Sequence, residues 1–130
     1  MMLCDTNIIS ELARPKPNKG VWTWASQHPH IYMSSISVDE LYFGLAWKPN
    51  PRISLWLNNF LQDYCTILAV DNKVARYAGD IRGHLQQQGQ LRTQADMLIA
   101  ATAAIHNLTL VTRNIKDFES CGVRLLNPFL

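Results

Sequence analysis

Oxygen-bearing side chains recur at points of the sequence where strands are expected to end or helices to begin. Five residues share this placement: Asp5, Glu40, Asp96, Asn114 and Asp117. Carboxylate and amide oxygens gathered in one place bind hard divalent cations such as Mg²⁺ or Mn²⁺. Such an ion stabilises negative charge and activates water during attack on a phosphodiester, so the pattern indicates metal-dependent nuclease chemistry.

The elements that must position these residues alternate between strand and helix. β-prone apolar segments predict strands at residues 1–4, 31–33, 65–70, 108–112 and 123–126. Helical spacing and capping residues predict helices that begin near residues 8, 21, 37, 51, 73 and 94. This alternation indicates an α/β fold with a parallel sheet and right-handed crossovers.

A parallel sheet brings these acids to one edge, because ligands bind outside the carboxyl ends of the strands. Asp5 follows the first strand, and Glu40 and Asp96 are expected in the first turns of crossover helices. Asn114 and Asp117 follow the fourth strand. The remaining acids are expected on helix bodies or later turns, among them Glu11, Asp63, Asp80 and Glu119.

Carboxylates that face one another need a compensating charge. Two unit charges about 4 Å apart repel by about 4 kcal/mol at an effective dielectric of 20, and a divalent cation removes that repulsion. The histidines and cysteines lack zinc-ligand spacing, which favours Mg²⁺ or Mn²⁺ over zinc. The three cysteines, Cys4, Cys65 and Cys121, are predicted to be small core residues.

Each acid also has a structural explanation as part of a helix cap. Asp5 is placed to cap the first helix, and Asp96 follows Thr93 by three residues, where an acid favours the helix dipole. Ser37 and Glu40 have the spacing of a capping box. Capping does not predict that the acids should share one sheet edge, and one residue can both cap a helix and bind a metal.

Length and composition limit the class of protein. The chain has 130 residues, 48% of them hydrophobic and 17% charged, with a net charge of +2, which predicts one domain over residues 1–130. No stretch approaches the roughly 20 apolar residues that cross a bilayer, so no membrane span is expected. The first residues have no basic leader, which predicts the absence of a secretory signal and a cytoplasmic location.

Five segments occur together in a specific order and spacing: residues 3–11 (LCDTNIISE), 37–44 (SVDELYFG), 96–103 (DMLIAATA), 111–118 (VTRNIKDF) and 127–129 (NPF). In this order they resemble the PIN-domain ribonucleases of the VapC family, the toxins of type II toxin–antitoxin pairs. The resemblance is greatest to the FitB-like branch of that family, and it runs over nearly the whole chain.

The resemblance implies a PIN-like three-layer fold with a five-stranded parallel sheet flanked by helices. It implies a metal site of Asp5, Glu40 and Asp96 that supports Mg²⁺- or Mn²⁺-dependent cleavage of RNA, with tRNA or rRNA as the expected substrate and inhibition of translation as the result. The expected partners are a VapB-type antitoxin, whose tail occupies the groove near the acids, and a second copy of the chain in a homodimer or a toxin–antitoxin hetero-oligomer.

The fourth position of the metal site departs from the pattern of many relatives. This sequence has Asn114 where they have an acid, with Asp117 one turn later. Either Asn114 helps hold a metal-bound water or Asp117 supplies the fourth carboxylate, and one or two ions are possible. Thr6 and Thr112 are predicted to orient carboxylates or waters, and Arg113 either meets an RNA phosphate or is simply solvated.

Aromatic residues are concentrated in the first half of the chain. A subset of them is a candidate groove for the antitoxin helix: Trp22, Trp24, Trp47, Trp56 and Phe60. Two other functions compete with the toxin hypothesis. One is a nuclease of the same fold that acts outside toxin–antitoxin biology, and the other is a catalytically silent binding module whose acids are only caps.

Overall fold

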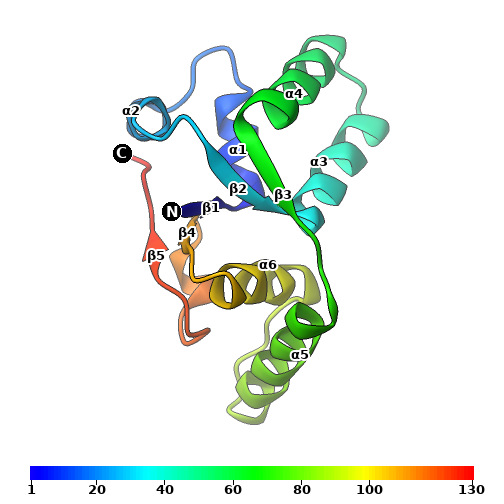
Figure 1. Cartoon of the computed structure of the whole chain (residues 1–130), viewed down its shortest axis with the longest axis vertical. Coiled ribbons are helices and arrows are strands. Elements are labelled where there is room, and N and C mark those ends of the chain that lie inside the picture. The colour runs from blue at the N-terminus through cyan, green and yellow to red at the C-terminus, as the bar shows by residue number, and fades with distance from the viewer.

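The computed structural model describes all 130 residues and contains five strands and six α-helices (Figure 1). The strands are β1 (Met2–Cys4), β2 (Ile31–Ser34), β3 (Cys65–Leu68), β4 (Thr109–Val111) and β5 (Leu125–Leu126). The helices are α1 (Thr6–Leu12), α2 (Lys19–Ser26), α3 (Ser35–Trp47), α4 (Pro51–Tyr64), α5 (Asn72–Gln87) and α6 (Gln94–Ile105), with a 3₁₀ turn η1 (Ile115–Phe118). The predicted alternation of strands and helices is confirmed.

The five strands form one parallel sheet in the order β3-β2-β1-β4-β5. The chain adds β2 and β3 on one side of β1 and then adds β4 and β5 on the other. In open α/β sheets a ligand crevice forms outside the carboxyl ends of the strands where the order reverses. That point lies between β1 and β4, where Cys4 pairs with Val111, so the topology places a crevice next to Asp5.

Side chains alternate between the two faces of the sheet and build two cores. Leu3 and Leu110 belong to the core shared with α5 and α6, whereas Cys4 and Val111 belong to the core shared with α1, α2 and α4. Figure 1 shows α5 and α6 on one side of the sheet and α1, α3 and α4 on the other. The predicted three-layer arrangement is confirmed.

The beginning of α3 differs from the sequence prediction. The helix starts at Ser35 directly after β2, and the Ser34 hydroxyl caps it by accepting from the Ile36 N–H at 3.1 Å. The expected capping box of Ser37 and Glu40 is therefore wrong, and Glu40 lies in the second turn rather than the first. The strand and the helix meet without a loop, so the serine nearest the strand end takes the capping position.

Helix α6 begins where predicted and contributes more buried residues than any other helix. Thr93 caps it by accepting from the Asp96 N–H at 3.1 Å, and residues 99–103 are buried. All three cysteines are free thiols; Cys4 and Cys121 are buried as predicted, while Cys65 is only half-buried. None of the helices is both long enough and apolar enough to cross a membrane.

Candidate active site

Three acids and one asparagine, from four separate segments, line one open cavity of about 440 Å³ at the carboxyl edge of the sheet, which we call the carboxylate cavity. Asp5 comes from the end of β1, Glu40 from α3, Asp96 from the first turn of α6 and Asn114 from the segment after β4. The structure brings these four residues to the same cavity, as their places in the sequence predicted. Asp117 does not line this cavity; it lines a neighbouring one that shares Asn114.

Asp5 is the most constrained of these acids, with only 5% of its surface exposed. Its Oδ1 accepts from the Thr6 N–H at 2.7 Å, and its Oδ2 accepts from the Thr112 hydroxyl at 2.8 Å and from the Asn7 amide at 3.1 Å. Asp5 therefore caps α1 and lines the cavity at the same time.

The electrostatic surroundings of Asp5 disfavour its charge. Burial, which is the largest cause, and the neighbouring charges of Asp96 and Glu40 together raise the pKa of Asp5 to about 6, although the hydrogen bonds from Thr112 and Thr6 lower it. A carboxylate that is buried beside like charges is stabilised by a cation. Asp5 is therefore suited to bind a cation, because the protein places no cationic side chain in contact with its carboxylate.

Thr6 connects α1 to Glu40. Its hydroxyl lies 2.7 Å from Glu40 Oε1 and 3.0 Å from the hydroxyl of Ser37, which is fully buried. Because one threonine hydroxyl carries one proton, Thr6 donates to Glu40 and accepts from Ser37. Thr6 and Thr112 therefore each hold one carboxylate of the cavity through a hydroxyl group.

Asp96 lines the same cavity from the first turn of α6. Burial raises its pKa, and the charges of Asp117 and Glu40 raise it further. Asp117 is thus near enough to affect Asp96 although it lies outside the cavity wall. The geometry therefore separates the two residues proposed for the fourth position: Asn114 lines the cavity, and Asp117 acts on it from η1.

One face of α1, continued by Arg14 just beyond its C-terminal end, forms a wall of the cavity that the sequence interpretation missed. This wall consists of Asn7, Ser10, Glu11 and Arg14. The expectation that Glu11 lies away from the site is wrong. A residue on a helix body can still line a cavity when it lies on the face of the helix that meets the cavity, as Glu11 does. The four positions have helical i, i+3, i+4, i+7 spacing from a helix that begins beside Asp5, and that spacing could have identified them.

Glu11 differs from the other acids because the protein already neutralises it. Its carboxylate forms an ion pair of 3.1 Å with Arg14 and accepts from the Asn18 N–H at 2.8 Å. Burial alone raises its pKa, but these hydrogen bonds and the charge of Arg14 lower the pKa below its ordinary value. No such ion pair exists for Asp5, Glu40 or Asp96, so no cationic side chain is in direct contact with these carboxylates.

The donor set fits a hard divalent cation. It contains carboxylate and amide oxygens and no thiol or imidazole, which suits Mg²⁺ or Mn²⁺. No three acidic, histidine or cysteine side chains are close enough together to form a ready-made metal cluster. An open cavity with spaced carboxylates is compatible with Mg²⁺, which keeps several water ligands and uses one or two carboxylates.

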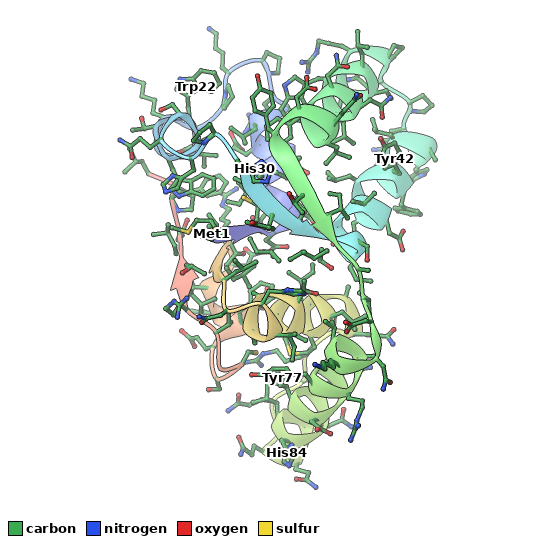
Figure 2. All side chains as sticks on the ribbon, in the orientation of Figure 1. Met1, Trp22, His30, Tyr42, Tyr77 and His84 are labelled. Carbon is green, nitrogen blue, oxygen red and sulfur yellow. The ribbon has the colours of Figure 1, made fainter.

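A second, apolar cavity of about 380 Å³ lies between α2 and α4. Its lining includes four of the five predicted aromatic residues: Trp22, Trp24, Trp56 and Phe60. Trp22 projects from α2 at the periphery of the molecule (Figure 2). Trp47 lies elsewhere, exposed on α3 next to Phe43, so the predicted groove contains a subset of the aromatic residues.

Comparisons with known proteins agree with this architecture. Residues 2–121 match the PIN domain family. The chain is 36% identical to the toxin FitB of Neisseria gonorrhoeae in an alignment of 137 positions, gaps included, with 99% of both chains covered. It is 33% identical to the VapC ribonuclease Y4jK of Sinorhizobium fredii in an alignment of the same length, with 99% of this chain and 98% of the relative covered.

The fold is also similar to a solved structure. The crystal structure of VapBC2 from Rickettsia felis bound to a DNA fragment from their promoter matches with a TM-score of 0.86 and 30% identity, over 97% of each chain. The likeness in sequence extends through every segment that contributes an acid to the cavity. The chain therefore belongs to the PIN-domain family, and within it to the group that contains the VapC ribonucleases and the FitB toxin.

Proposed function

We propose that this protein is a metal-dependent endoribonuclease and the toxin of a toxin–antitoxin pair. It hydrolyses phosphodiester bonds in tRNA or rRNA in the cytoplasm and thereby inhibits translation. The observation that carries the proposal is the convergence of Asp5, Glu40, Asp96 and Asn114 on one open cavity in a chain of the VapC and FitB group.

Mg²⁺ or Mn²⁺ is the proposed cofactor, held by Asp5, Glu40 and Asp96 either directly or through water. When bound, the ion supplies charge stabilisation at the phosphodiester and activates water. Thr112 and Thr6 fix the orientations of Asp5 and Glu40. Asn114 contributes a neutral amide oxygen at the cavity wall, so the cavity carries less negative charge than it would with an acid at this position.

Asp117 has a different proposed role, because it lies outside the cavity. Its charge favours protonation of Asp96 when no cation is present. A bound cation offsets the repulsion between the carboxylates of Asp117 and Asp96. Asp117, which lines the neighbouring cavity, thus attracts the ion electrostatically without binding it. This proposal allows for one ion in the carboxylate cavity and does not require a second.

The proposed protein partner is an antitoxin of the VapB type. An amphipathic helix fits the apolar cavity lined by Trp22, Trp24, Trp56 and Phe60. Another cavity, between α1, α3 and α4, shares Trp56 with it and is also lined by Glu40. These adjoining cavities give an antitoxin tail a route toward the acids, and a second copy of the chain completes the proposed homodimer or hetero-oligomer.

The decisive experiment uses the purified chain freed of any bound partner. Structured RNAs including tRNA are incubated with the wild-type protein in Mg²⁺ and in chelator, in parallel with Asp96→Asn. Thermal unfolding with and without Mg²⁺ measures ion binding separately, because a ligand that binds only the folded state raises its stability.

Discrete RNA fragments that require both Mg²⁺ and Asp96 are the expected result. Cleavage that persists in chelator or in a well-folded Asp96→Asn protein would exclude the proposed site. Absence of both cleavage and Mg²⁺-dependent stabilisation would instead favour a catalytically silent binding module. Cleavage without growth inhibition in cells would favour a nuclease outside toxin–antitoxin biology.

A further inference from the structure

Arg113 lies at the rim of the carboxylate cavity with its charge unpaired. It follows Thr112 at the end of β4, and its side chain is exposed. The single ion pair of the protein joins Arg14 to Glu11, so Arg113 is the cavity's free cation. Its guanidinium carbon lies 4.8 Å from the centre of the Phe129 ring, which leaves the N–H groups available to a ligand.

Phe129 is the one hydrophobic residue among the eleven that line the carboxylate cavity. The ring is half-buried, and it packs against the core shared with α1, α2 and α4 while also lining the cavity. The Arg113 guanidinium lies over the ring face, where a cation is attracted to the negative face of an aromatic ring. The ring thus restricts the arginine side chain and holds it beside the cavity.

Two asparagines fix the backbone under this pair. Asn127 donates from its amide to the Arg113 carbonyl at 3.4 Å and accepts from the Phe129 N–H at 3.0 Å. Asn7 accepts from the Arg113 N–H at 3.2 Å and donates to Asp5 Oδ2 at 3.1 Å. One continuous set of hydrogen bonds therefore links the backbone of Arg113 and of Phe129 to the buried carboxylate of Asp5.

The segment that carries Phe129 is anchored against α2. The Asn18 side chain donates to the Leu130 carbonyl and accepts from the Leu130 N–H, both at 3.1 Å. A Cβ atom on Gly20 would lie 2.2 Å from the Pro128 carbonyl oxygen, so only glycine permits this approach. These contacts with α2 and its cap hold the segment that places Phe129 against Arg113.

Arg113 also connects two cavities. Together with Asn114 it lines both the carboxylate cavity and the adjoining cavity, which contains Lys116, Asp117 and Asn127. An RNA strand has a phosphate at every nucleotide, so a strand with one phosphate at the acids presents the next one a short distance along the surface. An arginine is well suited to that phosphate, because its guanidinium offers paired donors and a fixed charge.

We propose that Arg113, held against Phe129, binds the RNA phosphate adjacent to the one that is cleaved and directs the strand into the cavity of Lys116 and Asn127. This inference rests on the proposed ribonuclease function and specifies how its substrate is placed. Arg113 contacts the RNA directly, and Phe129 is a positioning residue that acts through Arg113.

The test measures RNA binding apart from cleavage. Anisotropy of a short labelled single-stranded RNA is recorded in chelator over a range of salt concentrations for wild type, Arg113→Gln and Arg113→Lys. Arg82→Gln, on α5, is the matched control, because it removes the same charge from an exposed residue that lines neither cavity. Steady-state cleavage of tRNA in Mg²⁺ gives KM and kcat for the same proteins.

For Arg113→Gln, we expect Kd and KM to rise about tenfold, as for loss of one charge-assisted contact, with kcat changed less than about twofold. The slope of log K against log salt falls in magnitude by about 0.7, the value for one phosphate contact of a single strand. Arg113→Lys retains the charge and therefore retains the slope. Arg82→Gln leaves KM, kcat and the salt slope at wild-type values.

Phe129→Leu keeps an apolar side chain but removes the ring face, and we expect it to raise KM about threefold. The double variant Phe129→Leu/Arg113→Gln has the KM of Arg113→Gln alone, because the ring acts through the arginine. Circular dichroism of each variant excludes a folding defect. Additive effects of the two substitutions would overturn the positioning role of Phe129.

The inference and the proposed function fail in distinguishable ways. If the wild type cleaves RNA while Arg113→Gln matches Arg82→Gln in Kd and salt slope, the inference is wrong and the function stands. A loss of kcat with unchanged KM would also overturn it, because Arg113 would then act in the chemical step. If the wild type neither binds nor cleaves RNA, both are wrong.

Discussion

The Thr112 hydroxyl donates a hydrogen bond of 2.8 Å to Asp5 Oδ2 and so joins the end of β4 to the end of β1. Both side chains are buried. Burial raises the pKa of Asp5 to about 6, and the bond from Thr112 is the strongest influence in the opposite direction. Thr112 therefore helps set the fraction of Asp5 that is ionised near neutral pH.

Thr112→Val removes this donor and leaves a nearly isosteric side chain. We expect the pKa of Asp5 to rise further, which shifts the acidic limb of the pH–rate profile toward higher pH. Loss of a buried hydrogen bond also lowers the free energy of unfolding by about 1–2 kcal/mol. Thr112→Ser keeps the hydroxyl and should resemble the wild type in both measurements, and an unshifted profile in Thr112→Val would contradict the assigned role.

Asp5→Asn is expected to abolish cleavage and to stabilise the metal-free protein at neutral pH. Because the folded-state pKa of Asp5 is raised, ionisation of this carboxyl costs stability as the pH rises through about 6. The neutral amide avoids that cost, which corresponds to about 1–3 kcal/mol for a shift of this size.

Urea unfolding in chelator between about pH 5 and pH 8 tests this sign. The stability gain of Asp5→Asn over the wild type should be largest at pH 8 and should shrink toward pH 5, where the wild-type carboxyl is protonated. A gain that does not depend on pH would show that relief of charge is not its cause. Addition of Mg²⁺ should stabilise the wild type and leave the variant unchanged.

Glu11→Gln tests the one acid that the protein itself neutralises. The lowered pKa of Glu11 means that its ionised form stabilises the fold above the ordinary glutamate pKa, and that this stability is lost as the pH falls through the folded-state pKa. At pH 7 we expect a loss of about 1 kcal/mol or less, because the Arg14 side chain is largely exposed.

The deficit of Glu11→Gln relative to the wild type should disappear in acid, which is opposite to the trend for Asp5→Asn. Arg14→Gln should produce a similar loss, and the double variant should be no less stable than either single variant. A deficit that grows on acidification would contradict the charge pairing of Glu11 and Arg14.

Gly20→Ala and Gly83→Ala should have opposite effects on stability, although both residues lie in helices. An added Cβ at Gly83 meets nothing within 4 Å, so alanine gains helix propensity of about 0.5–1 kcal/mol. At Gly20 the Cβ would lie 2.2 Å from the Pro128 carbonyl oxygen, so alanine must displace the segment that carries Phe129. Thermal unfolding checks both signs; a stabilised Gly20→Ala would mean that this segment is not anchored there.

The sequence was sufficient to predict how the main acids come together. Asp5, Glu40 and Asp96 could be placed on one sheet edge because the strand–helix alternation determines which turns share that edge. The start of α3 could not be placed, because Ser34 and Ser37 are both good caps and the choice depends on where β2 ends. Local pattern alone does not determine such a boundary.

The cavity walls were less predictable than its acids. α1 begins almost directly after β1, and this starting point determines which face of the helix meets the cavity. Glu11 lies on that face and therefore reaches the site. Phe129 reaches it because the next residue, Leu130, forms hydrogen bonds with Asn18, which lies more than a hundred residues earlier in the chain. Contacts between such distant residues leave no periodic signal in the sequence.

The cavity combines Asp5 and α1 with Arg113, Asn114 and Phe129, so its walls come from opposite ends of the sequence. β1 is the central strand, yet its neighbour β4 leaves the ribosome only after most of the chain has been made. A nascent chain therefore has no complete site until the last segments have emerged and folded back. The proposed ribonuclease activity therefore cannot appear before synthesis of the chain is nearly complete.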